Sequence, residues 1–185
     1  METFLIGLTG PDVGARDTVA NLLDLQGWEL RELYQHVRES LYDLDPLVGA
    51  ELSVAQLVDR EGWPGALGHR IYGPEVNRLL AEVDDLLRGT GGPDVLVNLL
   101  AQELADTGGM PGPENGRRVV VTDIGTAEDA AWVRACGGQV WRVGARDEVD
   151  FRTGAGLIDV HLDEVEHPRA LAAAVEAHLY RRSAA

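Results

Sequence analysis

Short unbroken apolar runs alternate along this sequence with stretches in which apolar residues recur every three or four positions. The runs predict β-strands, as does the apolar–polar alternation at residues 28–33, and the spaced positions predict amphipathic helices. The predicted strands, about five in number, cover residues 3–9, 28–33, 118–123, 139–143 and 157–162. Around them, helices are predicted from Asp17 onward, over residues 128–136 and over residues 168–182. Strands that alternate with helices at both ends of a chain indicate an α/β fold with a parallel sheet.

The middle of the chain, residues 34–106, carries the helical pattern without a strand pattern and is predicted to form a helical subdomain. Four helices are predicted there, over residues 36–41, from Val54 behind a Ser53 N-cap, over 75–87 behind Pro74, and from Pro93 onward.

Three further features of this region give specific expectations. The Gly-Trp-Pro-Gly segment at residues 62–65 is predicted to end the second helix, and residues 107–116 are predicted to be a loop. In the third helix, the acidic residues Glu82, Asp84 and Asp85 have the spacing of an exposed face.

The composition restricts the chemistry of the chain. Its 185 residues include 16 basic and 31 acidic side chains, which give a formal net charge of −15. All sixteen basic residues are arginine, so reactions that need a lysine, including Schiff-base formation, are excluded. The negative charge opposes direct binding to nucleic acid, whereas a free nucleotide can still bind in a locally positive pocket.

Targeting signals and disulfides are not predicted either. The sequence has no apolar stretch of about 20 residues that could cross a membrane, and its amino-terminal segment lacks the basic region of a secretory signal. Cys136 is the one cysteine, so no internal disulfide can form. We therefore expect a cytoplasmic protein in which Cys136 is a buried structural residue.

The first predicted strand leads through a glycine-containing segment into a helix, which is the context of a phosphate-binding P-loop. The complete motif is G-x-x-x-x-G-K-[ST], in which backbone N–H groups, the helix N-terminus and a lysine hold the phosphates. Ala15 and Arg16 stand here in place of the glycine and the lysine. The alternative is an ordinary strand-to-helix turn with an exposed arginine. The candidate cofactor-binding residues are Gly10, Pro11, Asp12, Val13, Gly14, Ala15, Arg16, Asp17 and Thr18.

Several segments together resemble the phage-type deoxynucleoside monophosphate kinases, a branch of the P-loop kinases. They are Leu-Ile-Gly-Leu-Thr-Gly at 5–10, Arg-Asp-Thr-Val-Ala at 16–20, Leu-Val-Asp at 57–59, Pro-Glu-Val-x-Arg-Leu-Leu at 74–80, and Val-Val-Val-Thr-Asp at 119–123. The resemblance implies a three-layer P-loop kinase fold in one domain, residues 1–185. It also implies a helical substrate-binding insert at about 36–106 and a short lid at about 144–156. The implied reaction is transfer of a phosphoryl group from ATP, with Mg²⁺, to a deoxynucleoside monophosphate.

Phosphoryl transfer depends on arginines and on a carboxylate that holds Mg²⁺. Asp123 ends an apolar strand, as a Mg²⁺-binding aspartate of the Walker-B type does, although it could instead cap the next helix. Asp17 is the second candidate metal ligand, because it follows the position of the P-loop lysine. The candidate catalytic residues are Arg16, Asp123 and Arg146, and the candidate substrate-binding residues are Arg70, Arg78, Arg142 and Arg152. For each arginine, a solvated surface position is the alternative.

The sequence also departs from the family at functional positions. Asp123-Ile124-Gly125 stands where the family has Asp-Val-Arg, and the Gln and Gly-Thr-Glu expected after Leu79-Leu80 are missing. These departures leave two hypotheses open. The chain is an active kinase, or it is a pseudokinase that pairs with a second copy, with a competent kinase or with another partner through its surface.

Overall fold

The computed structural model describes residues 3–144, 155–163 and 168–180, which form two compact units. The sheet unit comprises Met1–Leu33 and Leu100–Ala185, and the helical unit comprises Tyr34–Leu99. The helical unit covers most of the predicted insert.

The sheet unit contains a five-stranded, all-parallel sheet, which confirms the predicted fold class. Its strands are β1 (Leu5–Thr9), β2 (Glu29–Glu32), β3 (Val119–Thr122), β4 (Gln139–Val143) and β5 (Val160–Leu162). They lie in the order β2-β3-β1-β4-β5, and every neighbouring pair is parallel. Each strand lies within the segment that was predicted to form it. The first strand of the chain is therefore the central strand of the sheet.

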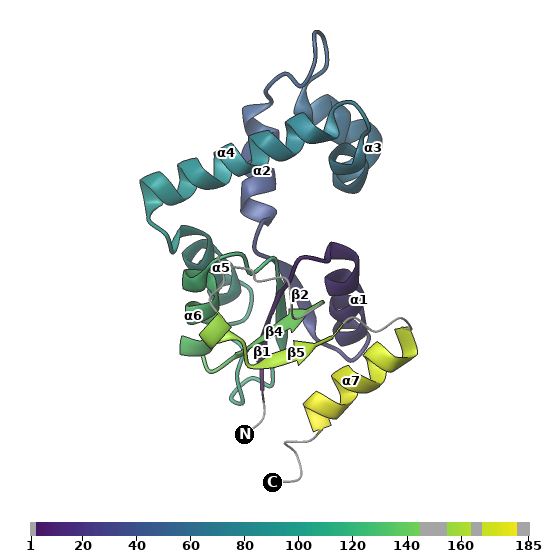
Figure 1. Cartoon of the computed structure of the whole chain (residues 1–185). Coiled ribbons are helices and arrows are strands. Elements are labelled where there is room, and N and C mark those ends of the chain that lie inside the picture. Colours follow the sequence, from purple (N-terminus) through teal and green to yellow (C-terminus); the bar gives the residue numbers. More distant parts are fainter. Residues whose placement is uncertain (1–2, 145–154, 164–167, 181–185) are drawn as a thin grey trace. The chain divides into compact units, whose positions relative to one another are not determined.

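Helices cover both faces of this sheet (Figure 1). Helices α1 (Val13–Asp24) and α7 (Pro168–Tyr180) lie on one face, and α6 (Ala127–Ala135) lies on the other. Alternating side chains of β1 supply the two cores. Ile6 and Leu8 pack in the core with α1 and α7, whereas a Cβ on Gly7 would lie 2.9 Å from Ile124 on the α6 face. The sheet unit thus has three layers.

The helical unit is built from α2 (Gln35–Leu44), α3 (Val54–Gly68) and α4 (Gly73–Gly91), and α5 (Val95–Asp106) leads from it back to the sheet unit. Ser53 caps α3 through a capping box with Gln56, as predicted for its N-terminus. The helix breaks at Gly62, within the predicted end at residues 62–65, but a second helical stretch follows directly. Gly62 (φ 70°, ψ 168°) interrupts the helix with a kink, and the chain then resumes helical geometry as far as Gly68.

A second correction concerns Asp84, which is buried rather than part of an exposed acidic face. Its carboxylate accepts a hydrogen bond of 2.6 Å from the hydroxyl of Tyr34 and forms an ion pair of 2.8 Å with Arg88. Glu82 and Asp85 are exposed, as predicted. The hydrogen bond and the ion pair thus compensate for the desolvation cost of burying the Asp84 carboxylate. The helical spacing of the sequence does not reveal these two partners.

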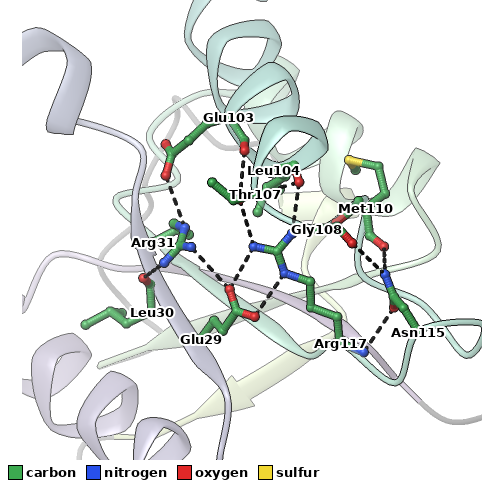
Figure 2. A network of polar contacts seen from close by, with 11 residues as sticks. Glu29, Leu30, Arg31, Glu103, Leu104, Thr107, Gly108, Met110, Asn115 and Arg117 are labelled. Carbon is green, nitrogen blue, oxygen red and sulfur yellow. Dashed lines mark hydrogen bonds and ion pairs between the residues drawn. The ribbon is translucent and has the colours of Figure 1, made fainter.

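The predicted loop at residues 107–116 is anchored to the sheet by Arg117 (Figure 2). The Arg117 guanidinium donates to both carboxylate oxygens of Glu29 on β2, at 2.9 and 2.8 Å. It also donates to the carbonyl oxygens of Leu104 and Gly109 and to the Thr107 hydroxyl. Arg31 joins the network through Glu29 and Glu103, at 3.2 Å from each. One planar cation thus connects β2, α5 and the loop.

Over the residues that the structure describes, no helix is both long enough and apolar enough to span a bilayer.

Candidate functional site

The carboxyl ends of β1, β3 and β4 bring the central candidate residues to one edge of the sheet. Gly7 pairs with Val121 on β3, so the end of β1 lies beside Asp123, which directly follows β3. On the other side of β1, Thr9 pairs with Arg142 on β4. Ligands of open parallel sheets bind at this edge.

The segment after β1 packs tightly against the end of β4. Gly10 has φ 128°, and a Cβ added there would lie 2.0 Å from the carbonyl oxygen of Val143. Gly144, with φ 109°, lies against Pro11 from the β4 side. Gly10 is therefore required by backbone conformation and by space.

The connection from β1 to α1 is shorter than the sequence motif predicts. Helix α1 begins at Val13 rather than at Asp17, so the non-helical segment is Gly10, Pro11 and Asp12. Gly14 and Ala15 lie in the first turn of the helix, and neither is among the described residues with positive φ. Alanine at position 15 therefore causes no backbone strain in this conformation.

The first turn of α1 satisfies its own polar groups. Asp12 is the N-cap, and its Oδ1 accepts the backbone N–H of Ala15 at 3.0 Å. The hydroxyl of Thr18 donates to the Gly14 carbonyl oxygen at 2.8 Å. This bond lies within the helix, because it joins the Thr18 side chain to the carbonyl four residues earlier. The sequence pattern did not reveal the capping role of Asp12, although aspartate is one of the favoured N-cap residues.

Arg16 and Asp123 form an ion pair across the loop, with 3.2 Å between Nη1 and Oδ1. The two side chains are 14% and 21% exposed, so Arg16 is not the freely solvated residue of an ordinary turn. Asp123 also does not cap the next helix, because Thr126 and Asp129 form the capping box of α6. Asp123 has φ 64°, a left-handed conformation at the end of a strand. Such strain persists where the surroundings hold it, and it clusters at functional sites.

Two further candidates in the sheet unit, Arg142 and Asp17, differ in their exposure to solvent. Arg142 is a buried cation on β4, whereas Asp17 is exposed on α1. Among the described residues, no group of three or more His, Cys, Asp or Glu side chains could hold a metal ion. Mg²⁺ commonly binds through one or two carboxylates together with water and substrate phosphates, so Asp123 and a nucleotide would fit it.

The remaining candidate arginines are not part of the described sheet unit. Arg70 and Arg78 belong to the helical unit, and Arg146 and Arg152 lie outside the described residues. Arg78 pairs with Glu75 and Glu82 on α4, and their hydrogen bonds raise the pKa of its guanidinium above the ordinary value. Its charge is already matched by two neighbours.

Cys136 lies away from this edge, and its predicted burial is wrong. It follows α6, is exposed, and lines a cavity of about 280 Å³ together with Phe4, Pro111 and Pro113. The partly apolar surroundings raise the pKa of its thiol, since desolvation disfavours the thiolate. This cavity lies at the amino ends of β1 and β4, opposite the Arg16–Asp123 pair.

Comparison with known proteins identifies the fold. No protein-family model matches the chain, and no curated protein matches it in sequence. Dephospho-CoA kinase from Campylobacter jejuni is similar in structure, with a TM-score of 0.56 and 10% identity over 98% of each chain. Shikimate kinase from Aquifex aeolicus aligns over 97% of this chain and 98% of its own at 12% identity, with a TM-score of 0.46. The chain has the α/β fold of the P-loop kinases, with five parallel strands.

Proposed function

We propose that this protein binds the phosphates of a nucleotide at the Gly10–Thr18 segment, with Arg16 in the place of the P-loop lysine. The observation that carries the proposal is the Arg16–Asp123 pair of 3.2 Å. It joins a cation at the start of α1 to a carboxylate at the end of β3, on the sheet edge where such folds bind ligands. The similarity to a structure named as a dephospho-CoA kinase supports a phosphate-binding role.

The reaction that fits these residues is transfer of the γ-phosphoryl group of ATP to a deoxynucleoside monophosphate. Bound Mg²⁺ would supply charge neutralisation between the phosphates, and Asp123 is the residue placed to hold it. Arg16 would contact phosphate oxygens through its guanidinium, which matches phosphate geometry differently from a lysine. Arg142, Arg146 and Arg152 are the proposed contacts to the transferred or acceptor phosphate. The acceptor class rests on the resemblance of the sequence.

A pseudokinase is the second candidate function, and the local geometry of the loop favours it. Gly14 and Ala15 are helical, and Asp12 occupies a backbone N–H at the helix N-terminus. On the predicted substrate helix, Arg78 is bound by two glutamates. In this alternative the scaffold is kept and its surface binds a second copy or a kinase partner.

Titration calorimetry tests binding directly. The wild-type protein is titrated with ATP, dTMP and dGMP, each with and without Mg²⁺. We expect ATP binding that Arg16→Ala weakens at least tenfold, since the variant loses a charge-assisted phosphate contact. Arg134→Ala is the matched control, because Arg134 is an exposed arginine on α6 in the same unit. Absence of binding by every nucleotide at millimolar concentration would refute the proposal.

A coupled ADP-release assay separates the active kinase from the pseudokinase. Turnover of any deoxynucleoside monophosphate by the wild type at about 1 s⁻¹ or faster would establish an active enzyme. If turnover by the wild type is slower than this, the double variant Ala15→Gly, Arg16→Lys distinguishes a weakened kinase from a pseudokinase. A weakened kinase gains activity from the restored motif, whereas a pseudokinase that lacks the other groups stays silent.

A further inference from the structure

Two carboxylates of the chain already occupy the groups that would bind phosphate in the proposed site. Asp12 accepts the Ala15 N–H at the N-terminus of α1, at 3.0 Å. Asp123 neutralises Arg16, the cation in the lysine position, at 3.2 Å. A phosphate group needs the same two kinds of partner, namely backbone N–H donors at a helix N-terminus and a cation.

The environment of each carboxylate holds it in this position. Asp12 follows Gly10, which packs closely against the Val143 carbonyl, and Pro11, whose ring lies beside Gly144 after β4. The Arg16–Asp123 pair is mostly shielded from water, so it is screened less than a surface pair. Within the described residues, the Nε of Arg16 is buried without a hydrogen-bond partner. The guanidinium therefore has a donor that Asp123 leaves unused.

The backbone of Asp123 supports a functional rather than a purely structural role for this pair. Asp45 and Asp123 are the two non-glycine residues with positive φ in the described part of the chain. Asp45 is the left-handed C-cap of α2, which is a common place for this conformation. Asp123 directly follows a strand and is not a helix C-cap, so a helix end does not explain its positive φ. The strained residue is also the one that forms the ion pair with Arg16.

We propose that the nucleotide site is autoinhibited by its own carboxylates, with Asp12 and Asp123 acting as internal substitutes for phosphate. This inference rests on the proposed function and specifies how that site is regulated. An incoming triphosphate must displace Asp12 from the Ala15 N–H and draw Arg16 away from Asp123. The second step frees the Asp123 carboxylate, so Mg²⁺ binds only together with the nucleotide.

The first test removes the charge of Asp12 and keeps its helix cap. Serine is also a favoured N-cap residue, so Asp12→Ser retains a hydrogen-bond acceptor for the Ala15 N–H. We expect ATP without Mg²⁺ to bind this variant about tenfold more tightly than the wild type by calorimetry, because a like charge near the phosphates is lost. Asp24→Ser is the matched control. It removes the same charge from the exposed far end of α1 and should leave ATP affinity unchanged.

The second test separates the two roles of Asp123. In Asp123→Asn, Arg16 is free of its ion-pair partner, so Mg²⁺-free ATP should bind about tenfold more tightly than in the wild type. The same variant should lose the enhancement of ATP binding that Mg²⁺ gives in the wild type. If Asp123 served only as a metal ligand, the variant would lose the Mg²⁺ enhancement but would not bind Mg²⁺-free ATP more tightly.

Spectroscopy gives a readout that does not depend on affinity. In amide NMR spectra, sodium tripolyphosphate should shift the Ala15 N–H resonance of the wild type, because its acceptor changes from a carboxylate to a phosphate. If the wild type binds ATP but neither variant binds it more tightly, autoinhibition is wrong and the proposed function stands. If neither the wild type nor the two variants bind ATP at millimolar concentration, both proposals fail.

Discussion

Gly10 is the residue at which the candidate site tolerates substitution least. Its φ of 128° lies in a region that side chains rarely adopt, and the Val143 carbonyl oxygen occupies the space of a Cβ. Gly14, in contrast, lies in the first turn of α1, and its Cβ would be 3.5 Å from Asp12 Oδ1, an ordinary contact. Two glycines of the same motif therefore have different structural roles.

We expect Gly10→Ala to lower the free energy of unfolding by about 2–4 kcal/mol, since it combines backbone strain with a clash against backbone. Gly14→Ala should leave this free energy unchanged or raise it by up to about 1 kcal/mol, because alanine favours the helix. Urea denaturation followed by circular dichroism measures both. Equal destabilisation by the two substitutions would mean that α1 does not begin at Val13.

The residues that the sequence could not place are those whose role depends on a distant partner. Asp84 has the spacing of an exposed residue, but Tyr34 and Arg88 make its burial possible. Asp123 was predicted as a strand-ending carboxylate, whereas its partner Arg16 and its positive φ depend on the parallel pairing of β1 and β3. Sequence spacing does not contain this three-dimensional information.

At the scale of elements, the Arg117 network stabilises the edge strand β2 and the loop at 107–116 (Figure 2). The side-chain hydrogen bonds from Arg117 lower the pKa of Glu29 below its ordinary value. A carboxylate with a lowered folded-state pKa stabilises the fold above the unfolded value of about 4.3, and this stabilisation is lost as the pH falls through the folded value. The network therefore weakens in acid.

We expect Glu29→Gln to be less stable than the wild type at pH 6 by about 1 kcal/mol, a modest value because the Glu29 side chain is 41% exposed and screened by solvent. The difference should shrink as the pH falls from 5 to 3, because the wild-type carboxylate then becomes protonated. Urea denaturation over this pH range provides the measurement. Glu114→Gln, an exposed change in the same loop, should show no such pH-dependent difference.

Local patterns predicted most elements, and the exceptions have physical causes. The three central strands β1, β3 and β4 follow from apolar runs that are buried on both faces of a parallel sheet. The edge strands β2 and β5 are less buried, and β2 was predicted from alternation rather than from an apolar run. The start of α1 was misplaced because the P-loop motif implied a longer loop, whereas Asp12 caps a helix that begins at Val13. The kink in α3 was taken for a helix end because Gly62 and Pro64 both signal termination, yet proline is compatible with the first turn of the helix that resumes.

At the scale of the whole molecule, the sheet unit and the helical unit each contain their own buried side chains and contacts. The Tyr34–Asp84–Arg88 cluster lies entirely within the helical unit. Such compact parts commonly open separately, with their own free energies of opening. The effect of breaking this cluster should therefore be confined to one unit.

We expect Asp84→Ala to lower the free energy of opening of α2 and α4 by about 2–3 kcal/mol, because the half-buried Tyr34 hydroxyl and Arg88 guanidinium both lose the buried carboxylate that they bind. Hydrogen exchange read by mass spectrometry should be faster in these helices, while β1 and β3 keep their protection. Asp85→Ala, which changes the exposed neighbouring aspartate, is the matched control. Faster exchange throughout both units would show that the chain opens as one cooperative body.

The central position of β1 has a consequence for synthesis on the ribosome. Leu5 pairs with Val119, and Ile6 pairs with Gln139, so the first strand to be translated waits for partners that are made more than a hundred residues later. At about 5–20 residues per second, this delay lasts roughly 5–30 s. The helices at residues 34–99 emerge during that interval and need no strand, so they can fold first. Meanwhile the apolar segment Leu-Ile-Gly-Leu-Thr remains unpaired, so side chains that are buried in the folded protein are exposed to aggregation until β3 and β4 have been made.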